Sequence, residues 1–347
     1  MRRRELLKGS AALTARGLVP GSALLLAGCG KEPVTLTRVS GPTMGTAFEI
    51  AIGTPGIDAE VVRAAAVEAL ERTEALMSTY RADSELSHFN RGADTDWVRI
   101  SPETAQVVGA ALSVAERSDG AFDPTVAPLV DLWGFGPGHA ADSPPAERHL
   151  SHALDHVGRH HLELHGERGA LRKHKALLSA DLSGVAKGWG LDEVARRLDT
   201  MGVDSYLIDV GGELRTRGRK PDGTPWRIGV ERPVPGPRAV HRVVHADDLA
   251  IATSGDYRNF FAHDGRHYSH TIDPRTGRSV EHALASVSVL HQSAMMADAW
   301  STALMVAGPE RGYELAKREG IAALFLARTA TGVADQATPA FAPHIVS

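Results

Sequence analysis

The stretch DLSGVAKGWGLDEVARRLDTMGVDSYLIDV, residues 181–210, is the part of the sequence that best defines the fold class. Apolar residues at helical spacing in its middle predict a helix that stops near Gly202. These residues are Leu191, Val194, Ala195 and Leu198. The run YLIDV at 206–210 then predicts a buried strand. A helix that leads directly into a buried strand indicates a domain of mixed secondary structure.

Outward from this stretch, helices and strands alternate irregularly. Asp58 is a predicted N-cap of a helix that ends near Ser78, and Ser101 with Pro102 predicts the start of another. Further elements are predicted on both sides of Pro309: a helix that carries Ala299, Trp300, Ala303 and Leu304, a helix that opens at Pro309, and a strand over 321–326. Because no regular strand–helix repeat appears, we predict an α+β fold.

The first thirty residues differ from the rest of the chain. A basic start with three arginines is followed by an apolar run that ends in Leu-Ala-Gly-Cys at Cys29, the only cysteine. This ending resembles a bacterial lipobox, so we expect residues 1–28 to be an export signal and Cys29 to carry a lipid anchor. The protein would then be exported and held on the bacterial membrane, facing the periplasm.

The remaining residues, 29–347, are expected to form one domain, with a candidate internal boundary in the Gly/Pro-rich loop 136–147. Hydrophobic residues make up 43% of the chain and charged residues 23%, which is typical of a globular protein. A net charge of −4 gives no electrostatic reason to expect a nucleic-acid partner.

Two segments suggest a site for an anionic ligand and a metal ion. The run DLSGVAKG at 181–188 leads into a helix, whose free amides and Lys187 suit a phosphate. Equally, Ser183 could cap the helix while Lys187 faces solvent. Asp298 and Thr302 stand four apart, so they share a helix face and could offer Mg²⁺ two oxygen ligands. Taken alone, the pair is also compatible with an exposed Asp298 and a Thr302 hydroxyl bonded back to its own helix.

His270 is a candidate proton acceptor, because an imidazole titrates near neutral pH. It begins the run HTIDPRTG, which reads as a strand end followed by a turn. A histidine satisfied by a backbone carbonyl is an equally good interpretation of this residue alone.

Taken together and in order, six segments resemble the ApbE family of FAD:protein FMN transferases, which are bacterial flavin-transferring lipoproteins. The segments are PTMGT at 42–46, MSTYR at 77–81, GAFDPTV at 120–126, DLSGVAKGWG at 181–190, HTIDPRTG at 270–277 and MMADAWST at 295–302. DVGGE at 209–213, IGVERP at 228–233 and ATSGDY at 252–257 agree as well. The resemblance runs from about residue 40 to about residue 308, with Phe48 where the family often has Tyr.

The resemblance implies a role for each matching residue. The expected FAD contacts are Met44, Tyr80, Ala121, Phe122, Asp123, Asp181, Lys187 and Ile272. The expected Mg²⁺ ligands are the carbonyl of Gly184 and the side chains of Asp298 and Thr302, while His270 or Asp298 would be the catalytic base. FAD would lie in a cleft between two lobes.

The reaction implied by the resemblance is transfer of FMN from FAD to a Thr or Ser hydroxyl of an acceptor protein, with release of AMP. A subunit of a redox-driven ion pump is an example of such an acceptor. Two alternatives stay open: an FAD pyrophosphatase that releases FMN and AMP, and a lipoprotein that only binds FAD.

Overall fold

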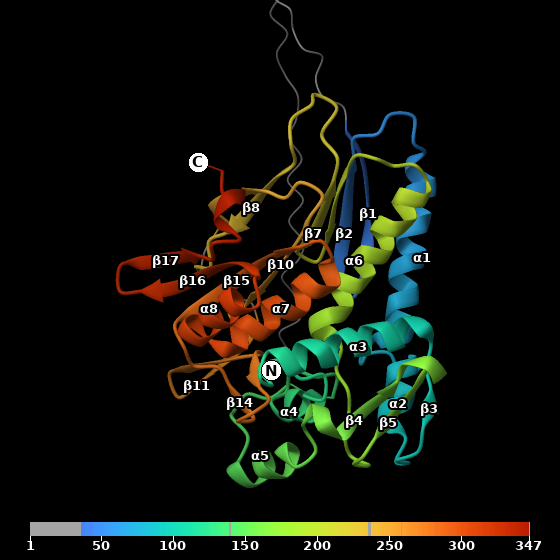
Figure 1. The fold of residues 1–347 in the computed structure, drawn as a ribbon. Coiled ribbons are helices and arrows are strands. Elements are labelled where there is room, and N and C mark those ends of the chain that lie inside the picture. The colour runs from blue at the N-terminus through green and yellow to red at the C-terminus, as the bar shows by residue number, and fades with distance from the viewer. Residues whose placement is uncertain (1–35, 139, 235–236, 258, 347) are drawn as a thin grey trace, which may run out of the picture. The chain divides into compact units, whose positions relative to one another are not determined.

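The fold is built on an eight-stranded sheet in which every neighbouring pair is antiparallel (Figure 1). The computed structural model describes residues 36–138, 140–234, 237–257 and 259–346, which belong to one compact unit. The predicted export signal and Cys29 lie outside these residues. In spatial order the strands are β1 (Thr37–Thr43), β2 (Thr46–Ile52), β6 (Tyr206–Val210), β7 (Glu213–Arg217), β10 (Ala250–Gly255), β15 (Leu284–His291), β16 (Ala322–Thr329) and β17 (Gly332–Ala337).

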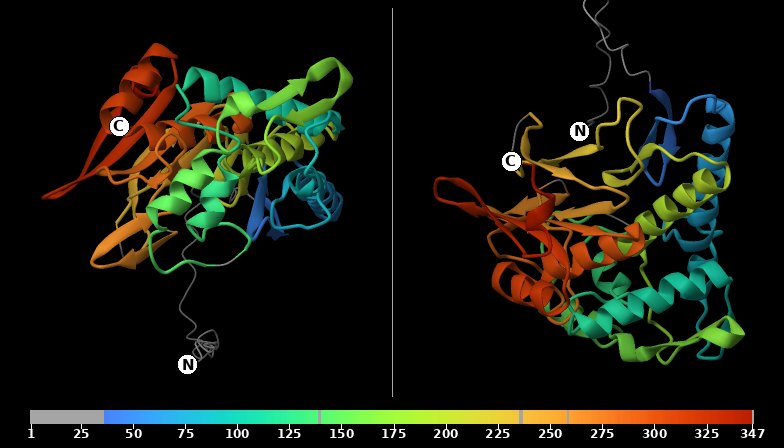
Figure 2. Two further views of the ribbon diagram at one scale, coloured as in Figure 1. Left: turned by 90° about the horizontal axis from the view of Figure 1, so that it is seen from below. Right: turned by 45° about the horizontal axis from the view of Figure 1, so that its top comes forward.

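Helices cover one face of this sheet. Among the described residues the helices are α1 (Ala59–Met77), α2 (Glu85–Arg91), α3 (Pro102–Arg117), α4 (Ala127–Leu132), α5 (Glu147–Leu154), α6 (Ser183–Thr200), α7 (Ala294–Ala307) and α8 (Pro309–Arg318). Figures 1 and 2 show α1, α6 and α7 following one another across the sheet, with α3 crossing outside them. α7 contacts β10 and β15, and α6 lies between α7 and α1.

The opposite face of the sheet is covered by the two-stranded ribbon β8 (Arg227–Glu231) and β9 (Val240–His245). Ile228 and Val230 of β8 pack against Ile251 and Leu290 of the central sheet. The strand β15 is therefore buried on both faces, and every residue of its sequence LASVSVLH except His291 is buried.

Smaller strands and 3₁₀ turns complete the fold. They are β3 (Val98–Arg99), β4 (Leu162–His165), β5 (Ala170–Lys173), β11 (Phe260–His263), β12 (Arg266–Ser269), β13 (Ile272–Asp273), β14 (Arg278–Ser279), η1 (Arg159–His161), η2 (Gly166–Arg168) and η3 (Ala342–His344). The loop 136–146 precedes α5 without a helix or strand in its described residues. None of the described helices combines the length and apolar content that crossing a bilayer requires.

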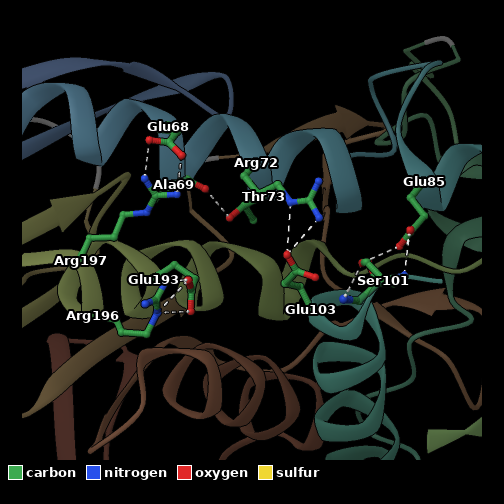
Figure 3. Close-up of polar contacts among 11 residues, drawn as sticks. Glu68, Ala69, Arg72, Thr73, Glu85, Ser101, Glu103, Glu193, Arg196 and Arg197 are labelled. Carbon is green, nitrogen blue, oxygen red and sulfur yellow. Dashed lines mark hydrogen bonds and ion pairs between the residues drawn. The ribbon is translucent and has the colours of Figure 1, made fainter. Parts of the chain in front are cut away.

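Polar contacts tie α1 to its neighbours along the outside of the helical layer (Figure 3). Arg197 of α6 pairs with Glu68 of α1 at 2.8 Å, and Arg72 of α1 pairs with Glu103 of α3 at 3.0 Å. Such exposed ion pairs stabilise a fold weakly, so the apolar contacts beneath them hold the helices in place.

The predicted elements are confirmed with small shifts at their ends. The Asp58 carboxylate caps α1, Ser101 caps α3, and the strand over 206–210 is β6. The N-cap proposed for Ser183 is wrong, because α6 begins at Ser183 itself and its N-cap is Leu182. The Asp181 carboxylate instead accepts the Ser183 amide at 2.8 Å. The α+β fold class is confirmed.

Candidate active site

A cavity of about 1380 Å³ lies between the central sheet, the first turn of α6 and several loops. All twelve residues to which the sequence assigned a role line it. They are Met44, Tyr80, Ala121, Phe122, Asp123, Asp181, Gly184, Lys187, His270, Ile272, Asp298 and Thr302. These residues come from six separate segments of the chain, so the fold brings together what the sequence holds far apart.

Met44 enters the cavity wall from the two-residue turn between β1 and β2. Its φ of +46° and the +70° of Gly45 are the left-handed angles that such a hairpin requires. The Met44 amide donates to Oε1 of Glu74 at 2.6 Å, which fixes the turn to α1. A Cβ on Gly190 would lie 2.9 Å from Met44 Cε, so the thioether rests on α6 where that helix has no side chain.

Asp123 holds the turn that carries Ala121 and Phe122. Its Oδ1 accepts from both the amide and the hydroxyl of Thr125, at 2.8 and 2.6 Å, and its Oδ2 accepts the Arg159 amide at 2.8 Å. Since both oxygens already have partners within the chain, the carboxylate of Asp123 organises the cavity wall. Its predicted contact with FAD stays a prediction.

Aromatic and apolar groups form another part of the cavity wall. The Tyr80 side chain is exposed, and its hydroxyl donates to the carbonyl of Phe135 at 3.0 Å. Phe122 and Ile272 are buried, so they shape the wall from behind. An exposed ring that is held at its hydroxyl end can stack on a flat heterocycle without a large loss of side-chain entropy.

α6 and α7 cross in close contact at Gly188. A Cβ on Gly188 would lie 2.2 Å from the carbonyl oxygen of Ala294, which leaves room for no other residue. The Gly188 amide donates to Oδ2 of Asp298 at 3.0 Å. One turn further along α6, the Asp192 carboxylate accepts the amides of Ala294 and Met295 at 2.9 and 3.1 Å. The start of α7 is therefore fixed to α6.

Lys187, Glu213 and Asp298 form a charged group at the cavity, in which both carboxylates are buried and Lys187 is half-buried. Lys187 Nζ lies 2.5 Å from Oε1 of Glu213, whose Oε2 is buried without a hydrogen-bond partner. Burial raises the pKa of Glu213 to about 7, with Lys187 opposing the rise and Asp298 adding to it. Burial also raises the pKa of Asp298, against Lys187 and the Gly188 amide. One cation thus faces two carboxylates.

The residues expected to bind Mg²⁺ meet at this point. A Cβ on Gly184 would lie 3.2 Å from Oγ1 of Thr302, so the start of α6 adjoins that hydroxyl, and Asp298 stands one turn earlier on α7. Among the described residues, no group of three or more His, Cys, Asp or Glu side chains is arranged to hold a metal. The donors fit Mg²⁺ only as a partial set of oxygens, which phosphate oxygens or water would complete. A bound cation would also favour the ionised forms of Glu213 and Asp298, whose pKa values burial raises.

His270 follows β12 at the mouth of the β11–β12 hairpin. Its Nδ1 lies 3.1 Å from the carbonyl oxygen of Asn259. A carbonyl can only accept, so Nδ1 carries the hydrogen and Nε2 keeps a free lone pair. Burial lowers the pKa of His270, although the bond to Asn259 works against this. The imidazole is therefore neutral near pH 7 and able to accept a proton.

Three groups of the site cannot be picked out by residue type alone. Glu213 and Ser254 stand in the segments DVGGE and ATSGDY, where neither spacing nor charge distinguishes them. Asn259 acts through its backbone carbonyl, which every residue has. The two glycines beside an acidic residue in DVGGE are the one signal that could have pointed to Glu213.

Comparisons with known proteins agree with the resemblance seen in the sequence. A family model described as ApbE family matches residues 44–325. The chain is 43% identical over 326 residues to a protein named FAD:protein FMN transferase from Vibrio cholerae, covering 93% of this chain and 97% of that protein. A protein of the same name from Salmonella typhimurium is 37% identical over 345 residues, covering 96% and 97%.

Solved structures match the fold over a similar length. The structure described as flavin transferase ApbE from Vibrio cholerae has a TM-score of 0.83 at 41% identity, covering 90% of this chain and 100% of that chain. The apo flavinyl transferase ApbE from Pseudomonas stutzeri has a TM-score of 0.82 at 39% identity, covering 89% and 96%.

Proposed function

Because this chain belongs to the ApbE family, we propose that it is an enzyme that transfers FMN from FAD to a Thr or Ser hydroxyl of an acceptor protein, with Mg²⁺ bound and AMP released. The observation that carries this proposal is the convergence of all twelve predicted residues on one cavity. At about 1380 Å³ the cavity exceeds the roughly 300–1000 Å³ typical of a small-ligand pocket. It therefore has room for a dinucleotide together with a segment of an acceptor.

The reaction is a phosphoryl transfer. The acceptor oxygen forms a bond to the FMN-side phosphorus of the pyrophosphate, the bond from that phosphorus to the bridging oxygen breaks, and AMP leaves with the bridging oxygen. Catalysis of such a step depends mainly on positioning and on neutralising charge. His270 Nε2 takes the proton of the attacking hydroxyl, since its lone pair is free and the ring is neutral.

Oxygen donors from two helices support a Mg²⁺ site of Gly184, Asp298 and Thr302. The bound ion would supply positive charge to the phosphate oxygens as the bond breaks. Lys187 forms an ion pair with Glu213, so its positive charge stabilises the buried carboxylates as well as any phosphate that binds nearby.

Intact-mass analysis of an acceptor domain, incubated with the purified protein, FAD and Mg²⁺, tests the proposal. A mass gain of one FMN, with AMP released and the gain abolished by EDTA, would establish the transferase. Unchanged acceptor with free FMN and AMP would make the protein a pyrophosphatase toward FAD. Intact FAD would leave a protein that binds flavin without transferring it.

We also propose that the protein is exported and anchored to the bacterial membrane by a lipid on Cys29, and that its acceptor is a protein on the same side of that membrane, such as a subunit of a redox-driven ion pump. The Leu-Ala-Gly-Cys ending supports the anchor. Fractionation tests it: Cys29→Ser should move the protein from the membrane to the soluble fraction. An unchanged membrane fraction would refute the lipid anchor.

A further inference from the structure

Three hydroxyl groups form a chain between α7 and the central sheet. Ser301 Oγ donates to the carbonyl oxygen of Asp298 at 2.9 Å. Ser254 Oγ of β10 lies 2.8 Å from Ser301 Oγ and 3.2 Å from Thr302 Oγ1. Ser254 is therefore the point at which the sheet touches both hydroxyl groups of the helix.

Counting hydrogens fixes the direction of this chain. Each hydroxyl has one hydrogen to donate and two lone pairs to accept with. The hydrogen of Ser301 is used on the carbonyl of Asp298, so Ser254 must donate to Ser301. With its own hydrogen used, Ser254 can only accept from Thr302. The hydrogen of Thr302 thus points to the sheet.

This direction differs from that of an ordinary helical threonine. A threonine hydroxyl in a helix commonly donates back to the carbonyl four residues earlier. For Thr302 that carbonyl belongs to Asp298, and Ser301 already occupies it. Thr302 lines the cavity beside Gly184, so its free lone pairs are available on the side where a cation would lie.

Ser254 is held rigidly enough to act in this way. It lies opposite Val287 in the register of β10 and β15. Two residues later, Asp256 forms a two-point ion pair with Arg328, with one contact of 2.8 Å. The chain that carries Ser254 is therefore fixed at the serine and again two residues after it.

We propose that Ser254 is a positioning residue for a divalent cation: it accepts the hydrogen of Thr302 and so presents the Thr302 lone pairs to the metal. This inference rests on the proposed function, because it presumes a cation at Asp298 and Thr302. Without Ser254, the Thr302 hydrogen has no partner on the sheet and is free to turn toward the metal. Cation affinity should then fall by roughly five- to tenfold.

The test is a titration of the full-length protein with Mn²⁺ in the presence of FAD, in which electron paramagnetic resonance measures free Mn²⁺. Ser254→Ala should bind Mn²⁺ roughly five- to tenfold more weakly. In a Thr302→Val background, Ser254→Ala should cause no further loss. Ser288→Ala is the matched control: it removes a buried serine hydroxyl that bonds Thr253 at 2.7 Å on the same pair of strands. Its Mn²⁺ affinity should stay at the wild-type value.

Each other outcome overturns the inference in a distinct way. An unchanged affinity in Ser254→Ala would show that Thr302 needs no partner on the sheet. Equal weakening with and without the Thr302 hydroxyl would show a general structural effect of the serine. Failure of the wild-type protein to bind Mn²⁺ would overturn the proposed metal site, and this role of Ser254 with it.

Discussion

The crossing of α6 over α7 should not tolerate a methyl group at position 188. In Gly188→Ala the new Cβ would meet the Ala294 carbonyl oxygen at 2.2 Å and the Met295 Cα at 2.7 Å, whereas ordinary contact begins near 3.4 Å. The helices must therefore separate by roughly 1 Å, and overpacking of this kind costs about 1–3 kcal/mol or more. Alanine regains about 1 kcal/mol of helix propensity. Because the neighbouring atoms belong to the backbone, we take the upper cost of about 3 kcal/mol and expect a net loss of about 2 kcal/mol in the free energy of unfolding.

Urea unfolding followed by circular dichroism measures this loss. Gly109→Ala in α3 is the matched control, because a Cβ there meets only Leu164 Cδ2, at 3.4 Å. That variant should gain about 1 kcal/mol from helix propensity. The rate of FMN transfer should fall in Gly188→Ala and not in Gly109→Ala. The reason is that separation of α6 from α7 pulls Asp298 away from the Gly188 amide. A Gly188→Ala protein as stable as Gly109→Ala would refute the close-crossing argument.

Three further predictions concern groups at the same crossing and cavity. Asp298→Ala should lower the rate of FMN transfer at least about a hundredfold, because it removes the carboxylate proposed to bind Mg²⁺, and full activity at saturating Mg²⁺ would disprove that role. In a pH profile of kcat/KM, activity should be retained above the lowered pKa of His270 and lost as pH falls through it, which places the acid limb below the ordinary 6.5. That limb should be missing in His270→Ala, and a limb that persists would exclude His270 as the base. Asp192→Ala should destabilise the protein by about 2–4 kcal/mol in urea unfolding, because it leaves the Ala294 and Met295 amides and Arg215 without their carboxylate partner. A loss under about 0.5 kcal/mol, the level of an inert substitution, would contradict this.

The helices and the strand over 206–210 were largely predictable from the sequence because their signals are local, whereas the cavity residues were assigned from the resemblance of six ordered segments to the ApbE family. Asp58 and Ser101 are capping residues beside apolar repeats, and those two patterns alone place α1 and α3. The YLIDV run is short, apolar and bounded by polar residues, which matches β6 residue for residue.

What could not be predicted depends on contacts between segments that are distant in the sequence. Glu213 gains its importance only when folding buries it and brings it to Lys187, 26 residues earlier in the chain. The order of strands in the sheet likewise depends on packing, so the sequence supports the α+β class and leaves the topology open.

The backbone of Met44 has a left-handed conformation that residues other than glycine seldom adopt. The next residue in the turn, Gly45, is left-handed as well, and there the residue is a glycine. Asparagine or glycine at position 44 would relieve that strain, while each would take the thioether out of the cavity wall. We therefore expect substitutions of Met44 that raise thermal stability to lower the rate of FMN transfer. A library of variants at residue 44 sorted by heat resistance alone and one sorted by FMN transfer should enrich different amino acids.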